Sequence, residues 1–171
     1  MKKLLTIAVA VMSAALVQAT SVDWGYEGDV LDKDGEYANG TLWVVYMGSD
    51  SDTSAITVDA SGNLSAGSYT VTATANVVDG LANNGEFITT ETSANGNYVM
   101  FAAYQGSDGY YYGHSDVQAV SGLTSDNTTT AAVNFGSSAM TLSTFVPVPE
   151  PCSVALLALG LAALGLKRKV A

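Results

Sequence analysis

Apolar and polar residues alternate with a period of two through the middle of the chain, from residue 20 to residue 146. The clearest example is SYTVTATANV (residues 68–77), in which five apolar positions alternate with five polar ones. Such alternation is typical of a β-strand with one face in a core and the other in solvent. TLWVVYM (Thr41–Met47) and YVMFAAY (Tyr98–Tyr104) are apolar at nearly every position, which indicates central strands buried on both faces.

Turn signals containing glycine separate these strands from several weaker ones. Asn95-Gly96 favours a tight turn, and we expect Glu86–Thr90 and Tyr98–Tyr104 to pair as a hairpin around it. No segment of residues 20–146 shows the period of a helix. The pattern predicts an all-β fold, namely an antiparallel β-sandwich that is jelly-roll-like or a partly closed barrel. Further strands are expected near Val22–Tyr26, Ala55–Val58, Tyr110–Tyr112, Asp116–Val120, Ala131–Phe135 and Met140–Phe145.

The first 19 residues have the pattern of a secretory signal peptide that forms an apolar helix. Lys2 and Lys3 precede a run of 14 mostly apolar residues, Leu4–Val17, which is too short for a stable membrane span. Val17-Gln18-Ala19 then places small residues where signal peptidase reads the chain. We therefore expect cleavage between Ala19 and Thr20, with an uncleaved anchor as the alternative.

A second apolar run lies at the other end of the chain. Residues 152–166 form a run of 15 residues, of which Cys152 and Ser153 are the most polar. As a helix this run would reach about 22 Å, against a hydrocarbon core of about 30 Å, so it is a short and weak anchor. Lys167, Arg168 and Lys169 follow it and should stay on the cytoplasmic side, which leaves residues 20–150 outside. Cys152 is the single cysteine, so no disulfide framework is expected.

Three alternating prolines stand in front of this apolar run, at positions 147, 149 and 151. They favour an extended, polyproline-like backbone. The order of Pro149-Glu150-Pro151, a short apolar helix and a basic C-terminal cluster resembles the PEP-CTERM sorting signal, which here would span residues 147–171. The resemblance implies recognition of Pro149-Glu150-Pro151 by exosortase, a membrane protease-transpeptidase that removes the helix and releases or re-attaches the protein. An ordinary C-terminal anchor is the alternative.

Charge divides the chain sharply. Between Thr20 and Glu150 there are sixteen acidic residues and one basic residue, Lys33, which leaves a formal net charge of −15. Such a surface repels phosphate backbones and argues against nucleic-acid binding. The cluster DVLDKDGE offers weak calcium candidates, but it lacks the spacing of an EF-hand loop. We therefore expect a solvated acidic turn rather than a metal site, and no cofactor; the candidate ligands are Asp29, Asp32, Asp34 and Glu36.

Catalytic motifs find little support in the sequence. His114 is the only histidine, and Asp116 lies two residues further on. No GxSxG motif or nucleophilic cysteine accompanies them. A glycosidase would need a pair of carboxylates, but the many acidic residues make any choice of pair arbitrary. We therefore do not expect an enzyme, and a hydrolase is the third and weakest of the functions considered.

Aromatic residues leave a carbohydrate-binding module open as the second function. Tyr110, Tyr111 and Tyr112, together with Trp43, Tyr46 and Tyr104, offer rings on which a polysaccharide could stack, although tyrosine also fills β-cores. The first expectation is an exported, non-enzymatic protein of the outer surface or extracellular matrix, and the resemblance implies that the bacterium is Gram-negative. The resemblance implies association with exopolysaccharide or biofilm, after transient anchoring in the inner membrane and processing by signal peptidase and exosortase.

Overall fold

Short strands joined by turns form almost all of the regular structure, as the period of two predicts. The computed structural model describes residues 20–92, 94–123 and 130–148. Within these residues the only helical elements are two single 3-10 turns, η1 (Thr53–Ala55) and η2 (Asn83–Gly85). The strands are β1 (Thr20–Gly25), β2 (Val30–Leu31), β3 (Gly40–Gly48), β4 (Thr57–Val58), β5 (Leu64–Ser65), β6 (Thr70–Val78), β7 (Leu81–Ala82), β8 (Ile88–Thr92), β9 (Gly96–Gln105), β10 (Gly109–His114), β11 (Gln118–Val120), β12 (Ala131–Asn134), β13 (Met140–Thr141) and β14 (Thr144–Pro147).

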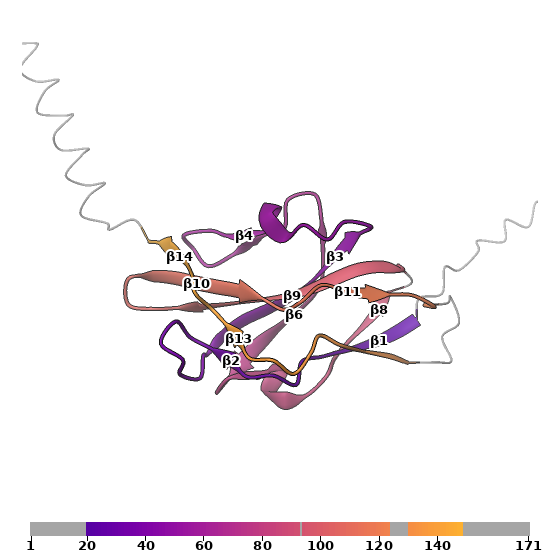
Figure 1. Ribbon diagram of the computed structural model, residues 1–171, viewed down its shortest axis with the longest axis horizontal. Helices are drawn as coiled ribbons and strands as arrows, with labels where there is room; N and C mark the ends of the chain where they lie inside the picture. Colours follow the sequence, from indigo (N-terminus) through magenta and orange to yellow (C-terminus); the bar gives the residue numbers. More distant parts are fainter. Residues whose placement is uncertain (1–19, 93, 124–129, 149–171) are drawn as a thin grey trace, which may run out of the picture.

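The largest sheet has the strand order β14-β10-β9-β3-β6-β7, and β11 also pairs with β9. All of its pairs are antiparallel. Its two central strands, β3 and β9, coincide with the two stretches that are apolar at nearly every position. Figure 1 shows this sheet in the middle of the molecule, with chain segments on both of its faces. The prediction of two central strands buried on both faces is therefore confirmed.

The principal core lies between this sheet and a second layer. The second layer contains a three-stranded sheet, β12-β1-β8, and a two-stranded pair, β13-β2. Trp24 of β1 is fully buried, and its ring centroid lies 4.6 Å from that of Tyr98 in β9. The Trp24 indole N–H donates to Thr90 Oγ1 at 2.6 Å, so its polar atom is satisfied inside the core. Truncating such a side chain typically costs about 3–5 kcal/mol.

A smaller apolar cluster covers the opposite face of the large sheet. Ile56 and Val58, from the segment between β3 and β6, pack over Trp43, Val45 and Phe101 of the sheet. This segment contains η1 and the β4–β5 hairpin, which lie above the large sheet in Figure 1. The large sheet is therefore covered on both faces.

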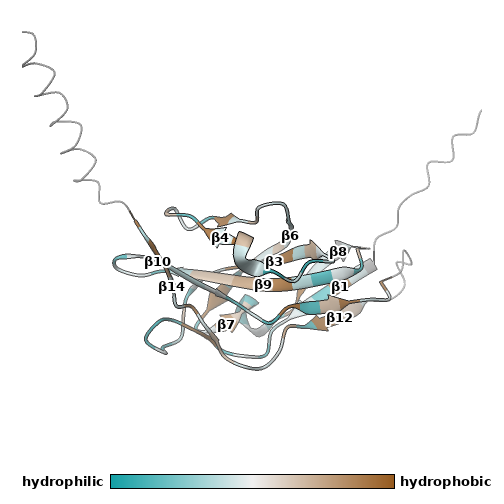
Figure 2. Ribbon diagram, turned by 45° about the horizontal axis from the view of Figure 1, so that its top comes forward, coloured by the Kyte–Doolittle hydropathy of each residue, from teal (hydrophilic) through white to brown (hydrophobic). Residues whose placement is uncertain are grey.

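Polar residues concentrate in the loops, whose teal colour in Figure 2 contrasts with the brown and white inner strands.

The predicted hairpin around Asn95-Gly96 is wrong. β8 pairs with β1, whereas β9 takes β3, β10 and β11 as its neighbours. The chain passes from the second layer to the large sheet at this point, and Gly96 has a φ of 151° rather than the value of a tight turn. Asn95 instead holds the loop of Leu123, accepting from its N–H at 2.8 Å and donating to its carbonyl at 3.1 Å. The physical reason is that β9 is apolar on both faces and fills the centre of the large sheet, whereas β8 has the alternating pattern of an outer layer.

Two further details depart from the predicted pattern. The alternation of residues 68–77 is interrupted by a β-bulge, because Val44 lies opposite Ala73 while the next residue, Val45, lies opposite Val71. Ala73 therefore faces the principal core, and Val71 is 40% exposed. The fold is also not purely antiparallel, since β1 pairs with β12, and β2 with β13, in parallel. Both parallel pairs join segments far apart in the sequence, where no short turn imposes antiparallel pairing.

Candidate functional site

The C-terminal strand leads the chain out of the β-domain. The predicted strand Met140–Phe145 is divided into β13, in the second layer, and β14, at the edge of the large sheet. Between them Leu142 is fully buried, and its N–H donates to the Leu31 carbonyl at 2.8 Å. β14 then pairs with β10, and its last residue, Pro147, lies opposite Gly109. The Phe145 ring lies 5.0 Å from the Tyr111 ring, between centroids.

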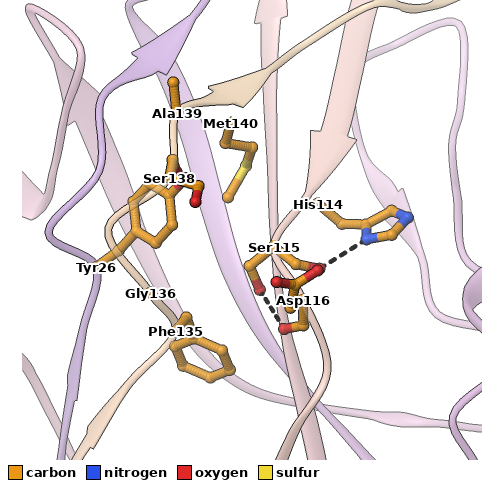
Figure 3. A pocket seen from close by; sticks show the side chains of 9 residues that line it. All are labelled: Tyr26, His114, Ser115, Asp116, Phe135, Gly136, Ser138, Ala139 and Met140. Atoms are coloured by element: carbon orange, nitrogen blue, oxygen red, sulfur yellow. Dashed lines mark hydrogen bonds between the residues drawn. The ribbon is translucent and has the colours of Figure 1, made fainter.

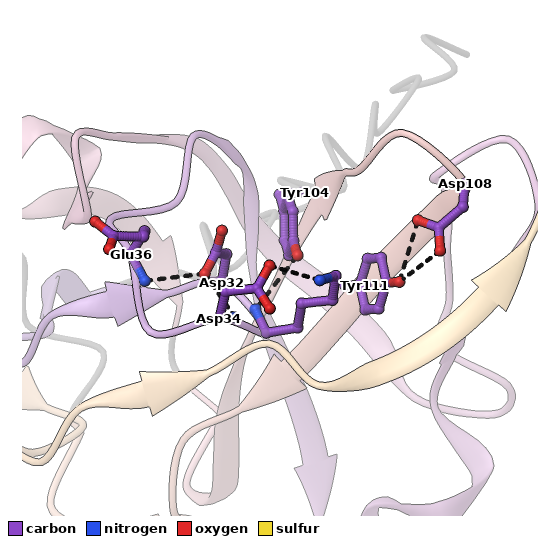
Figure 4. A network of polar contacts seen from close by, with 7 residues as sticks. Asp32, Asp34, Glu36, Tyr104, Asp108 and Tyr111 are labelled. Atoms are coloured by element: carbon purple, nitrogen blue, oxygen red, sulfur yellow. Dashed lines mark hydrogen bonds and ion pairs between the residues drawn. The ribbon is translucent and has the colours of Figure 1, made fainter.

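Acidic loops surround this exit. The β9–β10 hairpin, the loop between β2 and β3, and the β4–β5 hairpin all project toward the end of the molecule where β14 leaves it (Figure 1). Tyr111 links two of them, because its O–H donates to the Asp108 carboxylate at 2.9 Å and its ring lies 5.8 Å from Lys33 Nζ (Figure 4). Burial, and then the Asp108 hydrogen bond, raises the pKa of Tyr111. Lys33 also pairs with Asp34 at 2.5 Å, the single ion pair among the described residues.

The four weak calcium candidates lie in and before one of these loops, where Asp29, Asp34 and Glu36 are exposed and Asp32 is half-buried. Asp32 Oδ1 accepts from the N–H of Asp34 at 2.8 Å and of Glu36 at 2.9 Å. The bond from Glu36 is the main reason that the pKa of Asp32 lies below its usual value. In the described part of the chain, no three acidic, histidine or cysteine side chains are grouped so as to hold a metal ion. The Asp32 carboxylate therefore stabilises the turn in which it lies by accepting backbone N–H groups. Asp29 lies before this turn.

The same loop occurs a second time, in the β4–β5 hairpin. Asp59 Oδ1 accepts from the N–H of Ser61 at 2.8 Å and of Asn63 at 2.9 Å, so it takes the place of Asp32. Gly62 has a φ of 80° and Gly35 a φ of 87°, a conformation that glycine adopts at little cost. The bond from Asn63 is the main cause of the lowered pKa of Asp59. Sequence reading missed this repeat, although the shared spacing of aspartate and glycine signals it.

The three consecutive tyrosines serve mainly as packing residues. Tyr111 is only 7% exposed and faces the principal core, where its ring stacks on that of Tyr104 at 5.3 Å between centroids. Tyr110 and Tyr112 are half-buried on the opposite face and belong to the smaller cluster. Tyr110 lies over Gly62, where an added Cβ would approach its ring to 2.3 Å. The structure thus places the three rings on two faces, as alternation predicts, but leaves no row of free ring faces among them.

Other aromatic rings, which sequence reading did not single out, are more exposed. Tyr37 is 62% exposed and Phe87 is 56% exposed. Each covers a glycine: a Cβ added to Gly80 or to Gly25 would come within 2.5 Å of the Tyr37 or the Phe87 ring, respectively. Beside Tyr37, Asn39 Oδ1 accepts from the Asp79 N–H at 2.9 Å. The Tyr37 ring and the Asn39 side-chain amide thus both lie at the β6–β7 turn.

The His114 ring nitrogens contact groups other than the Asp116 carboxylate. His114 Nε2 lies 3.2 Å from Thr53 Oγ1, and its Nδ1 lies 2.8 Å from the Ser115 carbonyl. Ser115 Oγ accepts from the Met100 N–H and donates to the Asp116 carbonyl. These polar atoms are therefore engaged in local contacts, and the His114 ring points away from the small hollow that Ser115 and Asp116 line (Figure 3).

Tyr26 closes the other side of that hollow. Its O–H donates to the Ser138 carbonyl, and burial, with smaller contributions from Asp116 and Asp29, raises its pKa to about 12. The hollow holds about 100 Å³ and is lined by Tyr26, His114, Ser115, Asp116, Phe135, Gly136, Ser138, Ala139 and Met140. Tyr26 therefore has a structural role: its protonated O–H ties the β12–β13 loop to the segment that directly follows β1.

The predicted processing sites flank the described domain. Thr20 is the first residue of β1 and lies opposite Thr92 of β8, whereas Ala19 lies outside the described residues. Pro149, Glu150 and Pro151, the apolar run 152–166, and Lys167, Arg168 and Lys169 also lie outside them. Among the described residues, no helix has the length and apolar character needed to cross a membrane.

Comparison with known proteins gives one match, and it falls at the end of β14. No curated protein and no solved structure matches the chain. Residues 147–169 match the family model described as the PEP-CTERM protein-sorting motif. The match begins at Pro147 and covers the proline-rich element, the apolar run and the basic cluster, so the resemblance seen in the sequence is confirmed. The chain carries a PEP-CTERM protein-sorting motif, the mark of an exported protein that is sorted by exosortase.

Proposed function

We propose that this chain is an exported, non-enzymatic protein of the outer surface or extracellular matrix, associated with exopolysaccharide or biofilm. Signal peptidase releases its β-domain at Thr20, and exosortase processes its C-terminal signal. The observation that carries the proposal is the match of residues 147–169 to the sorting motif, which starts at the last residue of the last strand. The β-domain is thus the cargo that the signal delivers.

The local contacts of His114 and Ser115 support a cargo without catalysis. Both side chains bond to neighbouring backbone or hydroxyl groups, and Ser115 is buried. The acidic loops suit a domain that is released from the membrane, because a net negative surface keeps a protein soluble and separate from other copies. The chain is then only temporarily anchored in the inner membrane. The anchor consists of the apolar run 152–166 and the basic residues Lys167, Arg168 and Lys169.

The sorting step is tested by replacing Pro149, Glu150 and Pro151 together with alanine. We expect the variant to remain in the inner-membrane fraction, whereas the wild-type chain is released. Val148→Ala is the matched control, since it changes the neighbouring residue and leaves the proline–glutamate–proline element intact. Release of the triple variant at the wild-type level would indicate an ordinary anchor or another protease.

A carbohydrate-binding module is the second candidate, and the exposed ring of Tyr37 favours it. Tyrosine rings stack on sugars, and the nearby Asn39 side chain can hydrogen-bond to hydroxyl groups. Because the domain is strongly negative, its ligand would be a neutral glycan. Retardation of the domain in a gel containing hydroxyethylcellulose, but not in one containing anionic alginate, would support this function. Retardation that persists unchanged in Tyr37→Ala would count against this site.

A further inference from the structure

β14 is held to the domain along a single edge. It pairs only with β10 in the described part of the chain, through four residue pairs from Tyr112–Thr144 to Gly109–Pro147. Three of its four residues are exposed, and Val146 is half-buried. The chain is firmly attached to the domain two residues before β14, at the fully buried Leu142. The chain can therefore separate from the sheet after Leu142 while Leu142 stays in the principal core, and the main side chain that this would uncover is Tyr111, on which Phe145 packs.

The matched motif offers few backbone donors at its start. Positions 147, 149 and 151 are prolines, which have no N–H. Enzymes and domains that bind extended peptides use main-chain hydrogen bonds to hold them. Between Pro147 and Pro151 only Val148 and Glu150 can donate such bonds. The next donors upstream belong to β14, at Thr144–Val146, and lie where β14 pairs with β10.

The reach of the chain is also short while β14 is docked. The five residue steps from Pro147 to Cys152 span at most about 18 Å when fully extended. The acidic loops that carry Asp34, Asp59 and Asp108 surround the start of this short segment (Figure 1). Freeing Ser143–Pro147 would add five residues and at most about 18 Å. An enzyme in the membrane would then reach the motif without meeting these loops.

We propose that β14 separates from β10 when the chain is processed, and that the sorting enzyme binds Thr144–Pro147 in extended form as an upstream part of the signal. This inference rests on the proposed sorting function and adds residues that precede the matched motif. The Phe145 ring against Tyr111, and the close approach of β14 to Gly109, set the balance between the docked and the separated strand. Any change that favours docking slows processing, and any change that weakens docking speeds it.

A reversible crosslink tests this directly in the full-length chain. Tyr112→Cys combined with Thr144→Cys places two thiols at directly opposite positions of β10 and β14. In the oxidised form we expect processing to slow by roughly tenfold or more, with recovery after reduction. Each single cysteine variant controls for the lost side chain. Thr41→Cys with Asn76→Cys, at opposite positions of β3 and β6, is the matched crosslink that leaves β14 free and should be processed normally.

A second variant moves the balance in the opposite direction. Gly109→Val leaves Thr144–Pro147 unchanged and crowds β14 from the β10 side, because a Cβ at Gly109 would come within 2.3 Å of the Val146 carbonyl oxygen. We expect this variant to be processed about two- to fivefold faster than the wild-type chain. Processing of the oxidised Tyr112–Thr144 chain at the wild-type rate, or a Gly109→Val chain no faster than wild type, would overturn the separation of β14. The alanine variant of Pro149, Glu150 and Pro151 is followed in parallel. If it too is processed normally, the proposed sorting function fails, and the inference fails with it.

Discussion

Pro147, the last residue of β14, lies directly opposite Gly109, the first residue of β10. A Cβ at Gly109 would come within 2.3 Å of the Val146 carbonyl oxygen and 2.5 Å of the Phe145 ring. Glycine at this position therefore lets β14 lie close against β10. The pair also marks the point at which the β-domain ends and the sorting motif begins.

Gly109→Val should displace β14. Because the new side chain has no room beside Val146 and Phe145, we expect the free energy of unfolding to fall by about 1–3 kcal/mol. Urea denaturation measures this loss, and hydrogen exchange should show faster exchange of the β14 amides. Gly122→Asn is the control: apart from its chain neighbours, no atom of the described residues lies within 4 Å of a Cβ there, and asparagine tolerates a positive φ. A Gly109→Val domain with wild-type stability and a protected β14 would contradict this register.

Thr90→Val tests the pairing of β8 with β1. The substitution removes the acceptor of the buried Trp24 N–H, and an unsatisfied buried donor costs about 1–3 kcal/mol. Thr89→Val is the matched change on the solvent side of the same strand, where Thr89 Oγ1 bonds to Asp23 at 2.6 Å. It should cost no more than about 0.5 kcal/mol. Equal losses in the two variants, measured by denaturation, would speak against the placement of β8.

The turn built on Asp59 should make stability depend on pH. Its hydrogen bonds lower the pKa of Asp59 in the folded chain, so the ionised group stabilises the fold above the unfolded pKa of about 3.9. This contribution is lost as the pH falls through the lower, folded pKa. Asp59→Asn should therefore be less stable than the wild type at pH 6, and the difference between their melting temperatures should shrink toward pH 3. A difference that stays constant or grows over that range would refute this assignment.

Added salt should stabilise the domain, and calcium should have no further effect. The acidic residues of residues 20–150 face one cation, Lys33, and screening shortens the range of their repulsion from about 30 Å at 0.01 M salt to about 8 Å at 0.15 M. A folded-state calcium site would raise the melting temperature at constant ionic strength. Melting that is indifferent to salt would contradict the first expectation. A rise with calcium that is lost in Asp32→Asn/Asp34→Asn would contradict the second.

The sequence predicts the strands better than their partners. The central strands β3 and β9 follow from continuous apolar stretches, and the end of the domain follows from the prolines that start at position 147. The partner of β8 does not follow, because Asn95-Gly96 signals a tight turn locally while the two-faced apolar character of β9 decides its neighbours. The bulge between Val71 and Ala73 is equally hidden, since it depends on the register against β3.

The same limit applies to the candidate sites. The acidic loop at Asp32 was visible in the sequence, but its use as an acceptor for backbone N–H groups depends on the folded turn. The tyrosines at 110–112 were visible as rings, whereas their burial depends on Gly62 and Phe145 lying across from them. The position of the Tyr37 ring over Gly80 is likewise hidden in the sequence, because Gly80 lies 43 positions later in the chain.

Mass spectrometry of both ends of the mature protein tests the central claim most directly. The account predicts an N-terminus at Thr20 and loss of the apolar run 152–166 with its basic end, and it predicts that this loss requires Pro149, Glu150 and Pro151. A chain recovered outside the inner membrane that still begins at Met1, or that still ends at Ala171, would contradict it.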